Sequence, residues 1–562
     1  MNGRRARLLA SVLGCACNGA GGGADSGDVP EPVVCEGEVD VPDEALRELL
    51  LGILADPEAG DESSDGGADS VLTAQDLERL VGVQAAERGI ESLRGIECAT
   101  NLTSLGLAGN KIADLRPLAN LTGLRELELS RNPVGDLEPL RALVGLEKLV
   151  LGDAGVASLA VVAAMPALSH LDVASGSVAD LTPLKDLKNL ESLVLSNNKV
   201  GDIGPLAGLG ELFALELDGN TVRDLGPLAG LDKLEYLDVD NNLLTTLAPL
   251  AELRRLRDLE ASDNRLTDTA GVAGKPDLVE LSLEGNQISA LAGLGGLGGL
   301  TTLDVDANRL TDLGEAGDLE RLRTLSAREN MITDISAIAG LPELRRLDLR
   351  QNPDLVALGP LATLDMLDYV GVGGGMQDLD LAPLAALPLL RQVDLPGIGG
   401  ADYDLLAGLP ALRALVVTGA AVDAGDLAAI AGLAGLTNLA IRDTAIADLA
   451  PLQPLVGLQV LDAGGTAIDD FAPLLDLPAL QTVDVSGTDV ADIAGVAALE
   501  DLATLDLRET RVADLTPLVD HVRFRNGDTV DVTMTRLDAG DCPALDALRE
   551  RATTVVSDLT CE

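Results

Sequence analysis

Aspartate and glutamate recur at a fixed spacing in this sequence and could bind cations or basic groups. They stand between two apolar residues in a unit that recurs every 22 residues, as Glu216, Asp238 and Glu260 do. A column of carboxylates on one face attracts a basic protein or divalent cations, although like charges on neighbouring strands repel each other. We expect these side chains to be exposed and to bind a partner protein through Glu128, Asp172, Glu216, Asp238, Glu260, Asp304, Arg328 and Asp348. Flanking positions add Glu126, Asp218, Asp240, Asp258, Glu280, Glu284 and Asp306.

One acidic stretch also resembles a calcium-binding loop. Between Asp304 and Glu315, oxygen-bearing residues occupy the ligand positions of such a loop, but Arg309 stands where its tight turn needs glycine. Because the 22-residue unit explains each of these residues independently, we expect no dedicated metal site. Weak divalent-cation binding to the acidic surface stays open as an alternative.

Composition excludes most other chemistry. The 562 residues contain 40 Lys and Arg against 91 Asp and Glu, which gives a formal net charge of −51. Binding to nucleic acid or to anionic lipid needs basic side chains, so we expect neither. The two histidines, His170 and His521, have no second histidine or cysteine nearby, and we expect both to be ordinary surface residues. We predict no catalytic residue and no cofactor.

The elements that position the carboxylates follow from a strict repeat. Leucines stand eight, five and three residues before an asparagine, and the pattern keeps its 22-residue register from residue 110 to residue 352. The asparagines are Asn110, Asn132, Asn198, Asn220, Asn242, Asn264, Asn286, Asn308, Asn330 and Asn352. After an irregular stretch the same position is Thr444, Thr466, Thr488 and Thr510, so we count about 20 coils.

The main positions of the 22-residue unit each have a physical explanation. Leu105 and Leu107 alternate with polar residues, which predicts a short strand with one buried face, and strands one coil apart must pair in parallel. Side chains such as Asn110 can stack as a structural ladder that satisfies buried backbone groups. Asp114 and equivalent aspartates in eleven other coils precede a Leu-x-Pro-Leu type segment and suit a cap on a short helical turn. The outer side should therefore carry short 3₁₀ pieces and no full helices.

The two ends of the chain differ from the middle. Residues 1–14 are basic and then apolar and precede Cys15, which resembles a bacterial lipoprotein signal with Cys15 as the lipidated residue. Residues 15–34 have the composition of a flexible tether. Cys35, Cys98, Cys542 and Cys561 could form two end-local disulfides, although six cysteines allow many pairings. Cysteines confined to the ends favour an oxidising compartment.

The repeat, from about residue 80 to 520, resembles the leucine-rich repeats of internalins, with the unit Asn-x-Ile-x-Asp-Leu-x-Pro-Leu. The resemblance implies an α/β solenoid: a leucine-rich repeat horseshoe with a parallel β-sheet on its concave face, used for protein binding, and a cap at each end. Residues 41–55 and 73–80 are expected to form helices of the first cap. Residues 542–556 are expected to form a helix and then a strand in the last cap.

We therefore expect a signal peptide (1–14), a tether (15–34), an N-terminal cap with a first degenerate repeat (35–98), leucine-rich repeats (99–520, irregular over 353–444) and a C-terminal cap (521–562). The expected function is a non-catalytic protein-binding scaffold, lipid-anchored at the bacterial cell envelope and touching the membrane through its lipid alone. The alternatives are a cytosolic repeat scaffold or regulator, a calcium-dependent adhesin, and an enzyme with a site in the irregular stretch.

Overall fold

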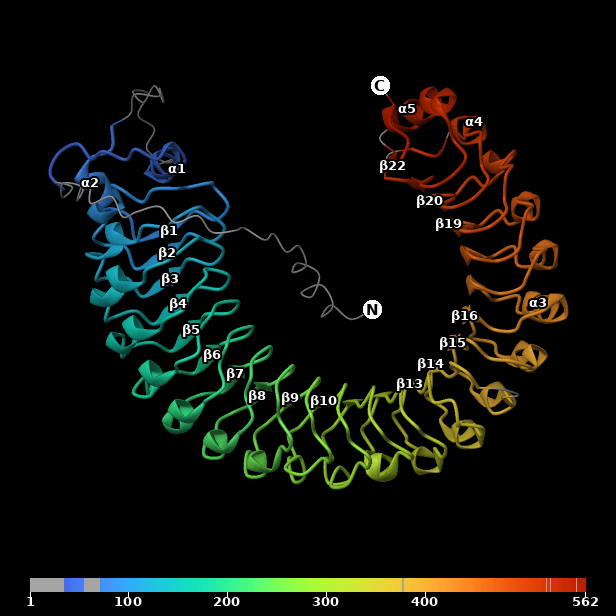
Figure 1. Ribbon diagram of the computed structural model, residues 1–562, viewed down its shortest axis with the longest axis horizontal. Coiled ribbons are helices and arrows are strands. Elements are labelled where there is room, and N and C mark those ends of the chain that lie inside the picture. The colour runs from blue at the N-terminus through green and yellow to red at the C-terminus, as the bar shows by residue number, and fades with distance from the viewer. Residues whose placement is uncertain are drawn as a thin grey trace, which may run out of the picture.

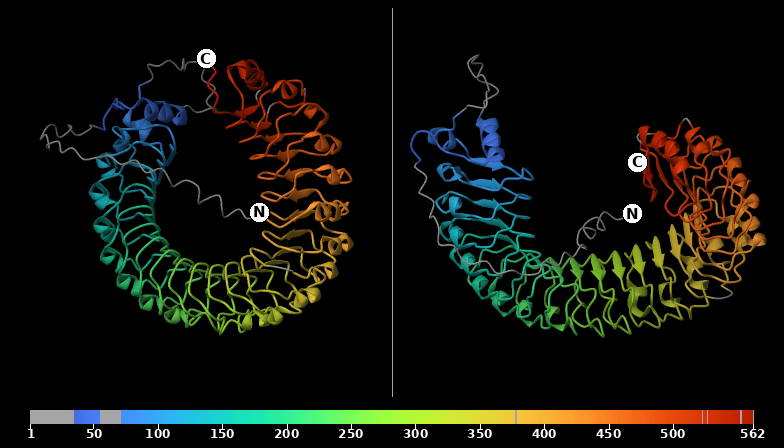
Figure 2. Two further views of the ribbon diagram at one scale, coloured as in Figure 1. Left: turned by 45° about the vertical axis from the view of Figure 1, so that its right-hand side comes forward. Right: turned by 45° about the horizontal axis from the view of Figure 1, so that its top comes forward.

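The computed structural model describes residues 35–54, 71–376, 379–521, 523–525, 527–551 and 553–561. The predicted signal peptide, Cys15 and the tether lie outside the described residues. The described chain winds into an open horseshoe in which strands line the inner face and short helices line the outer side (Figure 1). Two further views show the same arrangement of strands and helices (Figure 2). The predicted leucine-rich repeat horseshoe is thereby confirmed.

One parallel sheet of 22 three-residue strands forms the concave face. Each strand pairs with the next one along the chain, so that Leu105 lies opposite Leu127 and Leu237 opposite Leu259. The repeat count gave about 20 coils, and β21 and β22 of the C-terminal cap extend the sheet beyond them. The strands are β1 (Gly82–Gln84), β2 (Ser104–Gly106), β3 (Glu126–Glu128), β4 (Lys148–Val150), β5 (His170–Asp172), β6 (Ser192–Val194), β7 (Ala214–Glu216), β8 (Tyr236–Asp238), β9 (Asp258–Glu260), β10 (Glu280–Ser282), β11 (Thr302–Asp304), β12 (Thr324–Ser326), β13 (Arg346–Asp348), β14 (Tyr369–Gly371), β15 (Gln392–Asp394), β16 (Ala414–Val416), β17 (Asn438–Ala440), β18 (Val460–Asp462), β19 (Thr482–Asp484), β20 (Thr504–Asp506), β21 (Thr529–Asp531) and β22 (Thr554–Val556).

The outer side carries mostly 3₁₀ helices, as expected. Asp114 starts one of them by accepting a hydrogen bond from the N–H of Arg116 at 3.0 Å, and the equivalent aspartates of eleven other coils accept the same bond. The 3₁₀ helices are η2 (Ile96–Cys98), η3 (Arg116–Leu118), η4 (Glu138–Ala142), η5 (Ala160–Ala164), η6 (Thr182–Leu184), η7 (Gly204–Gly208), η8 (Gly226–Leu228), η9 (Ala248–Leu250), η10 (Gly314–Asp318), η11 (Ser336–Ile338), η12 (Gly359–Thr363), η13 (Leu384–Ala386), η14 (Tyr403–Gly408), η15 (Ala450–Leu452), η16 (Ala472–Asp476), η17 (Val496–Ala498) and η18 (Ala539–Asp541).

The asparagines hold neighbouring coils together. Asn242 donates from Nδ2 to the carbonyls of Leu217 in the preceding coil (2.9 Å) and of Val239 (3.2 Å), and its Oδ1 accepts from the N–H of Val222 (2.9 Å). All ten asparagines of the column are buried. The later threonines replace only part of this pattern, since Thr466 donates from Oγ1 to the carbonyl of Ala463 within its own coil. Each asparagine therefore links two coils, whereas the hydrogen bond that each threonine hydroxyl donates stays within one.

The expectation of no full helix on the outer side is wrong in one coil. Helix α3 (Ala424–Ala431) replaces a 3₁₀ turn, because Asp423 caps it and forms a capping box with Asp426. The sheet nevertheless continues in register through the irregular stretch, with Val370 opposite Val393 and Val393 opposite Leu415. A lengthened coil is thus absorbed on the outer side while strand pairing is kept.

Helices and disulfides close both ends. At the first end lie α1 (Glu44–Leu54) and α2 (Ala74–Leu77), with a capping box between Thr73 and Asp76 and the disulfide Cys35–Cys98. At the other end α4 (Thr516–Val519) and α5 (Cys542–Glu550) precede β22, and Cys542 is bonded to Cys561. These elements cover the apolar ends of the solenoid, which coils in the middle cover for one another.

The expectation that His521 is a surface residue is wrong. His521 is 1% exposed, its Nε2 lies 2.8 Å from the carbonyl oxygen of Leu499, and Phe524 donates its N–H to Nδ1. It falls 22 residues after Leu499, a core leucine, so the ring fills the core position of that column. His170 lies half-buried on β5.

Candidate functional site

Strands β7–β11 carry the most acidic part of the concave face. The outward positions of these strands, and the outward position two residues after each of them, hold ten carboxylates and no Lys or Arg. We call this set the acidic patch: Glu216, Asp218, Asp238, Asp240, Asp258, Glu260, Glu280, Glu284, Asp304 and Asp306. The strand register fixes it, because Glu216 lies opposite Asp238 and Asp238 opposite Glu260.

The expectation that the carboxylates of the column are exposed is wrong for part of the patch. Asp238 is only 9% exposed and Asp306 only 7%. Neighbouring strands lie only about 4.8 Å apart, so on the inside of a curve the side chains cover one another. The sequence register shows which face a residue occupies, but the curvature of the sheet sets how much water reaches it.

Burial changes the charge that the acidic patch carries. Desolvation, followed by repulsion from carboxylates that include Asp240, Asp218 and Glu260, raises the pKa of Asp238 to about 8. Desolvation also raises the pKa of Asp240 to about 6 and that of Asp304 to about 7. At neutral pH, Asp238 is therefore mostly protonated and can donate a hydrogen bond, while the more accessible carboxylates of the patch supply the negative charge.

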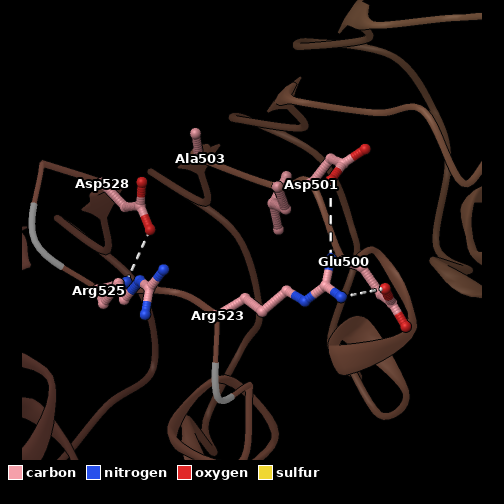
Figure 3. Close-up of a pocket in the computed structure, with 7 residues that line it drawn as sticks. Glu500, Asp501, Ala503, Arg523, Arg525 and Asp528 are labelled. Atoms are coloured by element: carbon pink, nitrogen blue, oxygen red, sulfur yellow. Dashed lines mark hydrogen bonds and ion pairs between the residues drawn. The ribbon is translucent and has the colours of Figure 1, made fainter.

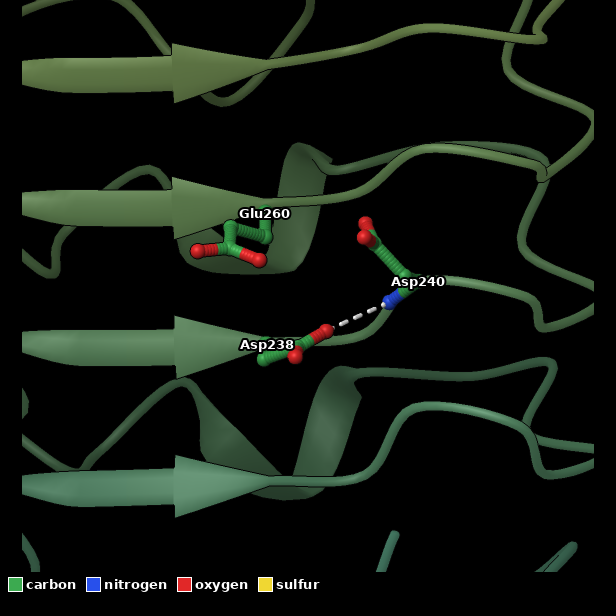
Figure 4. Close-up of side chains that lie close together, drawn as sticks. All are labelled: Asp238, Asp240 and Glu260. Atoms are coloured by element: carbon green, nitrogen blue, oxygen red, sulfur yellow. Dashed lines mark hydrogen bonds between the residues drawn. The ribbon is translucent and has the colours of Figure 1, made fainter. Parts of the chain in front are cut away.

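Three carboxylates of the acidic patch converge (Figure 4). Asp238 and Glu260 come from adjacent strands and Asp240 from the turn after β8; one oxygen of each lies within 4.8 Å of the others. The backbone N–H of Asp240 donates to Asp238 Oδ1 at 2.9 Å, which fixes the side chain of Asp238 against the turn after β8. Three oxygens at this spacing suit a hard divalent cation.

From the edge of the acidic patch onward, arginines pair with carboxylates of the concave face. Arg328, which follows β12, contacts Asp306 of the patch at 3.7 Å, and Arg350 pairs with Asp348 and with Asp394. Farther on, two more arginines bridge the same column: Arg442 contacts Asp462 and Asp484, and Arg508 contacts Asp506 and Asp531. The strands after β11 therefore carry a mixed face whose carboxylates are largely paired.

The residues expected to bind the partner occupy different settings. Glu216, Asp238, Glu260 and Asp304 come together in the acidic patch, whereas Glu128 lies apart and exposed on β3. Asp172 lies half-buried on β5, and burial raises its pKa. Arg328 and Asp348 belong to the paired region described above. Sequence reasoning missed Tyr236 on β8, the half-buried ring that lies among these acids; burial and the surrounding carboxylates raise its pKa strongly.

The irregular stretch is built around a tyrosine. Tyr369 is buried and donates its hydroxyl to Asp394 Oδ2 at 2.8 Å, while Arg346 lies 4.3 Å above the ring centroid. Tyr403 is also buried, at the start of η14. Both hydroxyls titrate far above neutral pH because burial raises their pKa. These contacts are those of a structural polar cluster between β13 and β15.

A hollow of about 600 Å³ lies near the C-terminal cap (Figure 3). Arg523 contacts Glu500 at 2.9 Å and Asp501 at 3.9 Å, and the backbone N–H of Arg525 donates to Asp528 at 2.6 Å. Because the hollow is open and both of these acids pair with Arg523, the acidic patch is the better candidate for a functional site.

Family comparisons identify the repeat in four segments. Models described as leucine-rich repeats match residues 100–142, 298–353 and 186–204, and the leucine-rich repeat of leucine-rich repeat and WD repeat-containing protein 1 matches residues 223–293. No curated protein matches the chain. Among the described residues, no helix is long and apolar enough to cross a bilayer.

Solved structures include bacterial and plant relatives of this fold. A crystal structure of an internalin, InlF, from Listeria monocytogenes is 24% identical, covers 75% of this chain and 96% of its own, and gives a TM-score of 0.40. Internalin C2 from the same species is 30% identical over 47% of this chain and 94% of its own, with a TM-score of 0.29. The plant peptide hormone receptor RGFR1 in complex with RGF2 is 16% identical, covers 83% of this chain and 85% of its own, and gives a TM-score of 0.52.

Proposed function

Since this chain is a leucine-rich repeat protein, we propose that it is a non-catalytic scaffold that binds a partner protein through the acidic patch. One observation carries the proposal: ten carboxylates gather on five adjacent strands with no Lys or Arg in the outward positions. On the strands after β11, Arg350, Arg442 and Arg508 stand among the carboxylates and pair with them. A basic partner surface would lower the repulsion within the patch and be drawn to it at long range.

We propose further that the scaffold is exported and anchored at the bacterial cell envelope by a lipid on Cys15, a residue outside the described part of the chain. The two disulfides, Cys35–Cys98 and Cys542–Cys561, support export because disulfides persist in oxidising compartments. The basic and apolar residues 1–14 support the anchor. Contact with the membrane would then run through the lipid alone, since a net charge of −51 is repelled by anionic headgroups.

Fatty-acid labelling tests the anchor and separates it from a cytosolic scaffold. Cells that express the full chain are expected to incorporate labelled palmitate into the wild type and none into Cys15→Ala, because an acyl chain needs the thiol of that cysteine. Cys17→Ala, which removes the neighbouring thiol, is the matched control and should label like the wild type. Equal labelling of the wild type and Cys15→Ala would contradict the anchor.

Partner capture tests the binding face. The full chain is expected to retain a partner from envelope extracts, and the triple variant Asp218→Asn, Asp240→Asn and Glu284→Gln is expected to lose it. The control removes three carboxylates that follow the outer helices η6, η9 and η10: Asp186→Asn, Glu252→Gln and Glu320→Gln. Two surfaces with equal charge loss are thereby compared. Loss of the partner in the control, with retention in the concave variant, would contradict the proposal.

Calcium-dependent adhesion is a second candidate, supported by the convergence of Asp238, Asp240 and Glu260. A cation bound only by the folded state raises the melting temperature. A shift in millimolar calcium that Glu260→Gln removes would support this candidate, and no shift in the wild type would remove it.

A further inference from the structure

A row of arginines borders the concave face next to the acidic patch. Arg323, Arg345, Arg391 and Arg413 each stand one residue before a strand, namely β12, β13, β15 and β16, and Arg346 is the first residue of β13. Backbone hydrogen bonds place them side by side, since Arg345 donates its N–H to the carbonyl of Arg323 and Arg413 donates to that of Arg391. All five side chains are exposed. We call these five residues the arginine row.

The equivalent positions, one residue before each strand, carry other charges in the first half of the horseshoe. There, Arg125 pairs with Glu147 at 3.6 Å and Arg257 pairs with Glu235 at 4.0 Å, each across neighbouring strands. In the arginine row, Arg323 pairs with Glu343. For the other four arginines, the described residues supply no ion pair. In the second half, glutamate therefore compensates only Arg323 of the row among the described residues.

This arrangement is unfavourable for the protein alone. Like charges on adjacent strands repel each other, and only Asp368, which precedes β14 and lies half-buried, interrupts the row. Exposed guanidinium groups without carboxylate partners among the described residues are suited to bidentate pairing with carboxylates from outside. The row therefore fits an anionic ligand, although the chain as a whole carries a net charge of −51.

Two features hold the row ready for binding. Arg346 lies 4.3 Å from the centroid of Tyr369, whose hydroxyl is anchored on Asp394, so the guanidinium rests on a fixed ring. Arg413 donates from Nη1 to the carbonyl of Leu412 at 2.7 Å. Leu389, two residues before Arg391, is 42% exposed and offers an apolar contact beside the charges. Arginine is among the residues enriched at the energetic centre of protein interfaces.

We propose that the arginine row docks a short acidic segment of the same partner protein whose basic surface meets the acidic patch. This proposal rests on the proposed function and deepens it. Across the five strands β12–β16, at about 4.8 Å per strand, the row spans about 19 Å, which matches roughly six extended residues. A long anionic polysaccharide would extend past the row into the acidic surroundings, whereas a short peptide segment ends within it. The concave face then has a negative region and a positive border, which together fix the orientation of the bound partner.

A labelled octaglutamate peptide tests the row on the full chain. Fluorescence anisotropy is expected to show binding that weakens as salt rises, because exposed charges are screened beyond about 8 Å at physiological ionic strength. The variant Arg345→Gln/Arg391→Gln should bind about 10-fold more weakly, from two exposed charge contacts of about 0.7 kcal/mol each. The control Arg125→Gln/Arg257→Gln, at the equivalent positions of the first half, should bind like the wild type.

Three results would overturn the proposal. They are no octaglutamate binding at low salt, equal loss in the variant and its control, and tighter binding of a heparin oligosaccharide of matched charge, which would assign the row to polysaccharide. If the proposed function is wrong, the result is a different one: the chain then still retains the partner after neutralisation of Asp218, Asp240 and Glu284. If that triple variant loses the partner while octaglutamate does not bind to the arginine row, the proposed scaffold function is supported and this inference is wrong.

Discussion

Replacing Lys275 by leucine is expected to raise the free energy of unfolding by about 3 kcal/mol at pH 7. Lys275 is fully buried and stands in a core column in which the neighbouring coils place Leu253 and Leu297. Its Nζ donates to the carbonyl of Leu250 at 2.6 Å. Desolvation lowers the pKa of Lys275 to about 8 from an ordinary value of 10.5, and each pKa unit corresponds to about 1.4 kcal/mol. Leucine removes the buried charge and restores the apolar column.

The gain should depend on pH in a defined direction. Below pH 8 the lysine is protonated in both the folded and the unfolded chain, so the wild type carries the whole penalty. Between pH 8 and 10.5 the folded state loses its proton first, and the penalty shrinks. Urea unfolding followed by circular dichroism should therefore show the two proteins converging as pH rises through this window.

A matched control separates burial from charge. Lys199 is exposed on a turn, so Lys199→Leu should change stability by less than about 0.5 kcal/mol. A Lys275→Leu protein that is no more stable than the wild type at pH 7, or a gain that is unchanged at pH 10, would contradict this description of the core.

Asn242→Ala is expected to destabilise its two coils by about 3 kcal/mol. The substitution removes the acceptor of the Val222 N–H and the donor to the carbonyls of Leu217 and Val239, all buried within the solenoid. A buried group without a partner costs about 1–3 kcal/mol, and some of these groups share other bonds. The loss should be local, since each coil contacts mainly its neighbours.

Amide hydrogen exchange reports this loss coil by coil. The amide of Val222 should exchange about 100-fold faster in Asn242→Ala, which corresponds to about 3 kcal/mol. Thr466→Ala is the control in the threonine half, because Thr466 gives up one bond, to Ala463, within its own coil. Its effect should be near 1 kcal/mol. Equal effects at both positions would show that the asparagines do not hold neighbouring coils together.

The coil architecture was predictable because every coil meets the same packing and hydrogen-bonding requirements with the same residue types. Leu105 and Leu107 give the strand its buried side, Asn110 satisfies the backbone where the strand ends, and Asp114 starts the outer turn. These signals lie within one 22-residue unit and recur, so register alone placed Glu216, Asp238 and Glu260 on one face.

Other features depend on distance between coils and were not predictable in this way. Asp238 is buried because the sheet curves, and a periodic sequence carries no measure of curvature. The position of Lys275 in the repeat does indicate burial, because it lies 22 residues after Leu253, in a core column. The same check, applied to the position 22 residues after Leu499, places His521 in the core. The expectation for His521 was wrong because it rested on the residue type and not on the column.

Site-specific photo-crosslinking tests most directly whether the concave face is the binding surface. A photoreactive phenylalanine analogue is placed at position 284 in the acidic patch or at position 252 after η9, in the full chain expressed in its cells. We expect a crosslinked partner from position 284 that disappears in Asp218→Asn/Asp240→Asn, and none from position 252. A partner that crosslinks from position 252 and not from position 284 would show that the acidic patch is not the binding surface.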